Sequence, residues 1–191
     1  MRYFLLLLAT FFSVGCSTPD HFNATDLTGS SIGMDFALKD QSGKQRRLSD
    51  FKGKVAIVFF GYTQCPDVCP TTLSSLQETL KLLGKDADRV QVLFITLDPE
   101  RDTAALLAQY VPSFHPSFLG LRGSAAETEA IAKAFKVFYK KQEGAMPGNY
   151  SIDHSTGSYV YDPSGRLRLY LKYGETPQRI AADVRTLLAG K

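Results

Sequence analysis

An uninterrupted apolar run at residues 55–60, Val-Ala-Ile-Val-Phe-Phe, constrains the fold more than any other part of the sequence. The run is short and rich in β-branched and aromatic residues, which is typical of a parallel strand buried on both faces. A helix is predicted next, because leucines recur at helical spacing after Pro70 and before the stop at Gly84, at positions 73, 76, 80 and 83. A buried strand followed by a covering helix indicates an α/β chain.

The later segments continue this alternation. We predict strands at 90–97 and 118–121, helices at 103–110 and 124–138, a hairpin at 159–161 and 167–171, and a last helix from Thr176-Pro177. Another hairpin, at 36–38 and 45–48, precedes the central strand. The order predicts an α/β fold with a mixed central sheet flanked by helices and an N-terminal β-hairpin. A thioredoxin-like fold is the simplest architecture with this order.

The first 31 residues are predicted to lie outside the folded domain. Residues 1–15 have a short positive start, an apolar run too short to span a bilayer and a small-residue exit, as in a secretory signal peptide. The exit resembles a bacterial lipobox, which makes Cys16 the candidate for lipidation. Ser13 stands where that motif usually has an aliphatic residue, and plain cleavage nearby is the alternative. We therefore expect a lipidated cysteine and flexible tether at 16–31, and one membrane-anchored, periplasmic domain at 32–191.

Composition excludes several classes of protein. A chain of 191 residues is long enough for one well-buried domain, and its 3 cysteines are too few for a disulfide scaffold. The net charge of +3 is spread along the chain without a basic block, so no nucleic-acid partner is expected.

Two cysteines lie between the first central strand and the helix that follows it. Cys65 and Cys69 fall in the segment Gly-Tyr-Thr-Gln-Cys-Pro-Asp-Val-Cys-Pro, at the carboxyl end of the strand, where open α/β sheets place their sites. A helical turn would bring both sulfurs to one face, and the helix N-terminus would lower their pKa. The spacing permits a redox disulfide, and it also suits two thiolates that bind one soft metal ion. Asp67, between the cysteines, is expected to cap the helix rather than to bind metal.

His154 lies in a polar segment just before the hairpin strand at 159–161. A lone histidine in a loop is more often solvated than a ligand, but in a thioredoxin-like sheet this loop faces the cysteine loop. A thioredoxin would carry a cis-proline here, and this stretch contains no proline between Gly148 and Asp162. Asp153 is a candidate acceptor that orients the imidazole from outside the ligand set, with loop capping as the alternative.

These segments together resemble the Sco/SenC family of copper-binding proteins that serve cytochrome c oxidase assembly. The resemblance rests on the cysteine segment at 61–70, on Leu-Asp-Pro-Glu-Arg-Asp-Thr at 97–103, on Asp153-His154-Ser155 and on Tyr-Asp-Pro-Ser-Gly at 161–165. It implies one copper ion, Cu(I) or Cu(II), held by Cys65, Cys69 and His154 in a membrane-tethered domain outside the cytoplasm. The donor chemistry agrees, because two thiolates suit Cu(I) and an added imidazole lets the site hold Cu(II) as well.

Two functions follow from this interpretation. The first is a copper metallochaperone that delivers copper to the copper-receiving subunit of cytochrome c oxidase. The alternative is a thiol–disulfide oxidoreductase whose catalytic dithiol, Cys65 and Cys69, reduces cysteines of an extracytoplasmic partner and is itself reduced by a thioredoxin-like protein. His154 and the missing cis-proline favour the first. A peroxidase is disfavoured, because the peroxiredoxin pattern would need proline at Val58 and threonine or serine at Tyr62. The charged segment 98–102 is expected to form a structural ion-pair network rather than to contact a partner.

Overall fold

Strand β4, Val55–Gly61, lies at the centre of the molecule and is buried along its whole length. The computed structural model describes residues 21–33, 35–145 and 149–190. Within these ranges the main sheet has eight strands in the order β1-β10-β9-β4-β5-β6-β2-β3. Strand β5 pairs in parallel with β4 on one side and with β6 on the other. The other pairings of this sheet are antiparallel, so the sheet is mixed as predicted. The other main-sheet strands are β1 (Thr25–Asp26), β2 (Ala37–Asp40), β3 (Gln45–Arg47), β5 (Val90–Thr96), β6 (Leu119–Arg122), β9 (Ser158–Tyr161) and β10 (Leu167–Leu171).

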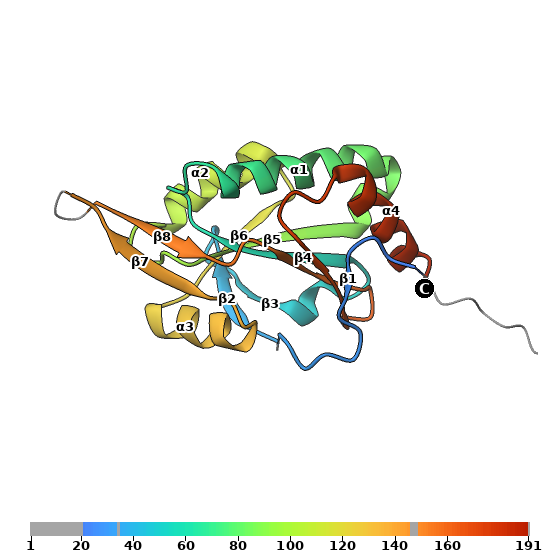
Figure 1. The fold of residues 1–191 in the computed structure, drawn as a ribbon, viewed down its shortest axis with the longest axis horizontal. Helices are drawn as coiled ribbons and strands as arrows, with labels where there is room; N and C mark the ends of the chain where they lie inside the picture. Colours follow the sequence, from blue (N-terminus) through green and yellow to red (C-terminus); the bar gives the residue numbers. More distant parts are fainter. Residues whose placement is uncertain (1–20, 34, 146–148, 191) are drawn as a thin grey trace, which may run out of the picture.

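Helices cover both faces of this sheet (Figure 1). Three helices pack on one face, namely α1 (Val68–Leu83), α2 (Ala104–Phe114) and α4 (Pro177–Leu188). Helix α3 (Ala125–Ala134) lies on the other face. Two short 3-10 helices, η1 (Leu48–Phe51) and η2 (Gly84–Arg89), precede β4 and β5.

The alternation of side chains in β4 explains why this strand is apolar throughout. Val55, Ile57 and Phe59 belong to the core beneath α1, α2 and α4. The intervening Ala56, Val58 and Phe60 belong to the core on the α3 side. A strand between two cores has no face left for polar residues. The predicted sheet and helices are confirmed, with ends that differ by a few residues.

The structure adds a hairpin that the sequence analysis did not predict. Strands β7 (Tyr139–Glu143) and β8 (Tyr150–His154) form a separate two-stranded antiparallel sheet, which projects from the body of the molecule (Figure 1). The helix predicted through Phe138 ends at Ala134, because Lys136 takes a left-handed conformation with φ of 54°. His154 therefore ends a strand and is not part of a loop.

The N-terminal boundary of the domain also differs from the prediction. The segment predicted to be a tether through residue 31 joins the fold from Phe22, whose ring is 8% exposed. Thr25 and Asp26 pair with β10, and the carboxylate of Asp183 on α4 accepts hydrogen bonds from the backbone N–H groups of Asn23 and Ala24. One buried aromatic ring and a short edge strand are enough to hold this otherwise polar segment against the domain.

Candidate metal centre

The two cysteines are presented by the connection from β4 to α1. Cys69 lies in the first turn of α1 and is fully buried, whereas Cys65 lies before the helix and is half-buried. The expectation that one helical turn carries both sulfurs is therefore correct only for Cys69. Gly61, the last residue of β4, lets this arrangement form, because a Cβ there would lie 2.7 Å from the sulfur of Cys69.

His154 reaches the cysteines from the end of β8. Its Nε2 lies 3.5 Å from the sulfur of Cys69, and its Nδ1 lies 2.8 Å from the backbone oxygen of Ser155. A carbonyl oxygen only accepts hydrogen bonds, so in the neutral imidazole the proton is on Nδ1 and Nε2 keeps its lone pair for a metal. The rings of Tyr62 and Phe59, with centroids 5.9 and 6.5 Å from that of the imidazole, limit its rotation.

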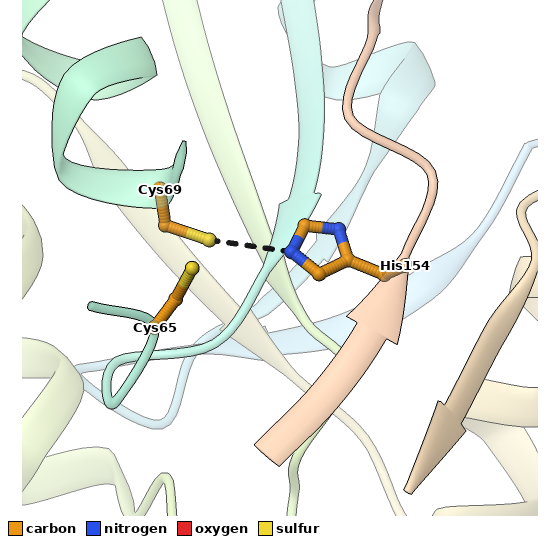
Figure 2. Close-up of side chains that lie close together, drawn as sticks. All are labelled: Cys65, Cys69 and His154. Atoms are coloured by element: carbon orange, nitrogen blue, oxygen red, sulfur yellow. Dashed lines mark hydrogen bonds between the residues drawn. The ribbon is translucent and has the colours of Figure 1, made fainter. Parts of the chain in front are cut away.

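Cys65, Cys69 and His154 converge on one point (Figure 2). Their donor atoms all lie within 4.8 Å of one another, and no other three potential ligands gather in this way among the described residues. Three donors that each lie about 2.0–2.3 Å from one ion are about 3.6–4.0 Å apart in a trigonal arrangement, so small side-chain movements would close the site. Two sulfurs and one imidazole nitrogen match copper better than zinc, which normally takes a fourth ligand.

The environment makes the two thiols unequal. A hydrogen bond from Cys69 outweighs burial and, with backbone N–H groups at the start of α1, lowers the pKa of Cys65 to about 4. The same hydrogen bond, together with burial, raises the pKa of Cys69 above its ordinary value. At neutral pH the metal-free site holds a thiolate at Cys65 and a thiol at Cys69.

Asp153 does not orient the imidazole of His154. It precedes His154 in β8, so its side chain points to the opposite face of the hairpin, where it accepts a hydrogen bond of 2.6 Å from Gln142. The carbonyl of Ser155 orients the ring instead. The prediction for Asp153 is therefore wrong, because it treats as a loop what the structure shows to be a strand.

Two further predicted positions are accounted for. Asp67 occupies the N-cap position of α1 as expected, although its carboxylate accepts from the hydroxyl of Thr71 and not from a backbone N–H. Cys16, the predicted lipidation site, lies outside the described residues.

Segment 98–102 supports both halves of the site, and the sequence analysis predicted the network but not this role. Asp102 is fully buried and accepts from the backbone N–H and the hydroxyl of Thr63, two residues before Cys65. Burial raises its pKa, and the hydrogen bonds from Thr63 and Thr96 act in the opposite direction. Buried Asp98 forms an ion pair with half-buried Arg101, and both contact Tyr150 in β8.

Tyr62 also supports β8, a role that was not predicted from the sequence. The hydroxyl of this buried residue accepts the backbone N–H of Ile152 at 3.2 Å. The signal available was the alternation Tyr150, Ile152, His154, which places one aromatic, one aliphatic and one imidazole side chain on the same face of a strand.

The protein is a thioredoxin-like α/β domain in which two free cysteines and one histidine lie together at the carboxyl end of a parallel strand. These features define a class of proteins with a thiolate–imidazole metal site. The chain belongs to the SCO1/SenC family, whose model matches residues 24–189.

Known proteins of this family are similar to the chain over most of its length. An SCO2-like protein of Rickettsia conorii is 40% identical over 155 residues, which cover 81% of this chain and 76% of the relative. The structure of Bradyrhizobium japonicum ScoI with copper bound is 43% identical and has a TM-score of 0.76, covering 82% of this chain and 99% of that one. The solution structure of apo Sco1 from Thermus thermophilus is 42% identical with a TM-score of 0.78, covering 90% and 100% of the two chains. The predicted fold and family are confirmed.

Within the described ranges, no helix combines the length and the hydropathy needed to cross a bilayer.

Proposed function

We propose that this protein is a copper metallochaperone that binds one copper ion through Cys65, Cys69 and His154 and delivers it to a copper centre of cytochrome c oxidase during assembly. The observation that carries the proposal is the convergence of these three donors within 4.8 Å. A structure of Bradyrhizobium japonicum ScoI, 43% identical, contains copper. The oxidase as recipient follows from the resemblance to the Sco/SenC family.

The site is suited to ligand exchange. Buried Cys69 and the oriented imidazole hold the ion from the protein side, whereas half-buried Cys65 is the sulfur that solvent and an incoming ligand can approach. A thiol of the copper-receiving subunit would replace Cys65 first, and the ion would pass across without net oxidation or reduction. The protein acts as a binding protein in this step rather than as an enzyme.

A copper titration of the purified, fully reduced protein tests the proposal. Cu(II) added without air should produce an intense thiolate-to-copper band that saturates at one equivalent. Cys65→Ser or Cys69→Ser should abolish tight binding, and His154→Ala should lose the Cu(II) form while it keeps much of the Cu(I) affinity. His115→Ala is the matched control, because the imidazole of His115 bonds to Ser117 near the surface and is not part of the three-donor group. Equal retention of Cu(II) in His154→Ala would refute the three-ligand site.

A second function, reduction of a partner's disulfide, is favoured by the unequal exposure of the two cysteines. The half-buried thiolate of Cys65 would attack the partner's disulfide and form a mixed disulfide, and Cys69 would then attack Cys65 and release the reduced partner. Two electrons pass to the partner, and a thioredoxin-like reductant would restore the Cys65–Cys69 dithiol. Rapid disulfide formation without a copper band in the titration above would favour this function.

We also propose that Cys16 carries the lipid anchor and that the domain lies on the periplasmic side of a membrane. The short apolar leader and the lipobox-like exit support this location. Metabolic labelling with a fatty acid should mark the wild-type protein and not Cys16→Ser, and an unlabelled wild-type protein would contradict the anchor.

A further inference from the structure

The position of His154 depends on what holds the β7–β8 hairpin against the rest of the protein. This hairpin shares no strand pairing with the main sheet and projects from it (Figure 1). Near His154, the backbone N–H of Ile152 donates to the hydroxyl of Tyr62 and attaches β8 to the cysteine segment, while the backbone N–H of Ser155 donates to the carbonyl of Phe138 and closes the base of the hairpin itself. Four residues before His154, Tyr150 lies on the same face of β8, about 13 Å away along the strand. A hairpin attached only at its base could tilt, so a second attachment at Tyr150 fixes its direction.

Arg101 makes this second attachment through Nη1, Nε and the face of its guanidinium group. One terminal nitrogen donates to the backbone oxygen of Tyr150 at 2.8 Å. The group also stacks on the Tyr150 ring, with Cζ 3.5 Å from the ring centroid. Its Nε donates to the carboxylate of Asp98, whose side chain is fully buried. A planar fork can make these three contacts at once, and a lysine ammonium cannot.

Asp98 closes the arrangement from the other side. Its second carboxylate oxygen accepts a hydrogen bond of 2.8 Å from the hydroxyl of Tyr150, so the tyrosine is held at both its ring and its backbone. In the same segment, Asp102 holds Thr63 of the cysteine loop. Residues 98–102 therefore contact both halves of the site and determine the separation between the sulfurs and the imidazole.

We infer that Arg101 is a positioning residue for His154: by fixing Tyr150 it fixes the direction of β8 and brings the imidazole Nε2 to the two sulfurs. The inference rests on the proposed copper function, and its effect is specific to the histidine ligand. The cysteines belong to other elements, so binding that needs only two sulfurs should not depend on Arg101.

Arg101→Gln, which removes the charge and the fork, tests this role. In the purified, reduced protein it should weaken the thiolate-to-copper(II) band as His154→Ala does, with Cu(II) affinity lower by about ten-fold or more. Cu(I) affinity should stay at the wild-type level, and Arg101→Lys should restore the band only in part. In the metal-free protein, hydrogen exchange at the Ile152 amide should become faster.

Arg46→Gln is the matched control. Arg46 forms an ion pair of the same kind, 2.7 Å from the buried carboxylate of Asp40, but near the turn of the β2–β3 hairpin. It should keep the wild-type copper band and Ile152 exchange, which separates positioning from a general loss of stability. If Arg101→Gln does not fold, Arg101→Lys decides by itself, because it keeps the positive charge beside Asp98 and loses only the planar fork.

The outcomes separate this inference from the proposed function. A wild-type protein without a copper band contradicts the proposed function, and Ile152 exchange in the metal-free variants still decides whether Arg101 anchors β8. A band of wild-type intensity in Arg101→Gln, unchanged exchange at Ile152, or an equal loss of the band in Arg46→Gln would each overturn the role of Arg101.

Discussion

At the scale of single residues, the site depends on which atom of each side chain is available. The imidazole of His154 has two nitrogens, and the carbonyl of Ser155 occupies one of them at 2.8 Å, so only Nε2 faces the sulfurs. Similarly, only one of the two cysteines is exposed enough for a partner to reach. These assignments come from the backbone around each residue and not from the residue types.

The pairing of the thiols gives a pH dependence that can be measured. In the metal-free protein, alkylation of Cys65 should follow an ionisation near pH 4, because the thiol of Cys69 and backbone N–H groups stabilise the thiolate. The alkylation rate should therefore be nearly independent of pH above about 6. The alkylation rate of an ordinary thiol would still rise with pH there, because its pKa is about 8.5. Site-resolved mass spectrometry after brief alkylation between pH 3 and 9 would measure it.

Replacement of the donor provides the control for this prediction. Cys69→Ala removes the sulfur hydrogen bond and should raise the pKa of Cys65, whereas Cys69→Ser keeps a hydroxyl donor and should raise it less. The same midpoint in wild type and Cys69→Ala would show that Cys69 does not stabilise the thiolate.

At the scale of elements, the two hairpins of the main sheet use the same turn. Asp40 begins one turn and Asp162 begins the other, and both turns have the sequence Asp-x-Ser-Gly. In both turns one carboxylate oxygen accepts from the serine N–H and hydroxyl and from the N–H four residues on, and the other oxygen accepts from an arginine. One acidic side chain thus satisfies two backbone N–H groups and one hydroxyl group in each turn.

We expect Asp162→Asn to destabilise the protein by about 2 kcal/mol at neutral pH, because the hydrogen bonds to the charged carboxylate weaken. Burial alone would raise the pKa of Asp162, but the hydrogen bonds from Ser164 and Arg166 outweigh it and lower the pKa. The carboxylate therefore stabilises the fold above its unfolded pKa of about 3.9, and this contribution is lost as the pH falls through that value and the lower folded pKa. Urea unfolding at pH 7 and between pH 5 and 3 would measure both effects.

Asp88→Asn, at an exposed position in η2, is the control and should leave the free energy of unfolding nearly unchanged. If Asp162→Asn and Asp88→Asn show the same acid dependence as the wild type, the carboxylate of Asp162 does not stabilise the turn.

The elements also show why one part of the architecture could be predicted from the sequence and another could not. Strand β4 is predictable because burial on both faces requires apolar residues at every position. Strand β7 contains Lys140, Lys141 and Gln142 in a row, and its partner β8 buries a single residue, Ile152. The hairpin is held by contacts to residues far away in the chain, such as Arg101. The pattern of apolar and polar residues within the hairpin does not indicate these contacts.

The same distinction applies to the site. Cys65 and Cys69 could be placed together from their spacing and from their position after β4, whereas His154 was placed only by analogy with the fold. Asp153 was misassigned because its direction depends on whether the segment is a strand or a loop. Successive side chains of a strand point to opposite faces, so Asp153 points away from the face on which His154 lies.

At the scale of the whole molecule, the N-terminal segment closes one edge of the sheet. Phe22 packs into the core beneath α4, and Thr25 and Asp26 add a short strand to β10. A fragment that begins at residue 32 should therefore be less stable than one that begins at residue 21, by about 3 kcal/mol for the loss of a buried aromatic ring. Urea unfolding of the two fragments would measure the difference, and equal stabilities would show that this segment only rests on the surface.

Phe22→Ala in the longer fragment separates the ring from the strand. It should account for most of the loss, whereas Thr25→Ala, an exposed position in β1, should change the free energy of unfolding by less than about 0.5 kcal/mol.

If Cys16 carries the proposed lipid anchor, the attachment of Phe22 limits how far the domain can move from the membrane. The chain from Cys16 to Phe22 would then be the whole connection between the lipid and the domain, and its maximum length is about 20 Å. The domain would then search for its recipient by lateral diffusion in a thin layer above the bilayer. A recipient would have to present its copper site at that height, which favours a membrane-bound partner over one that diffuses freely.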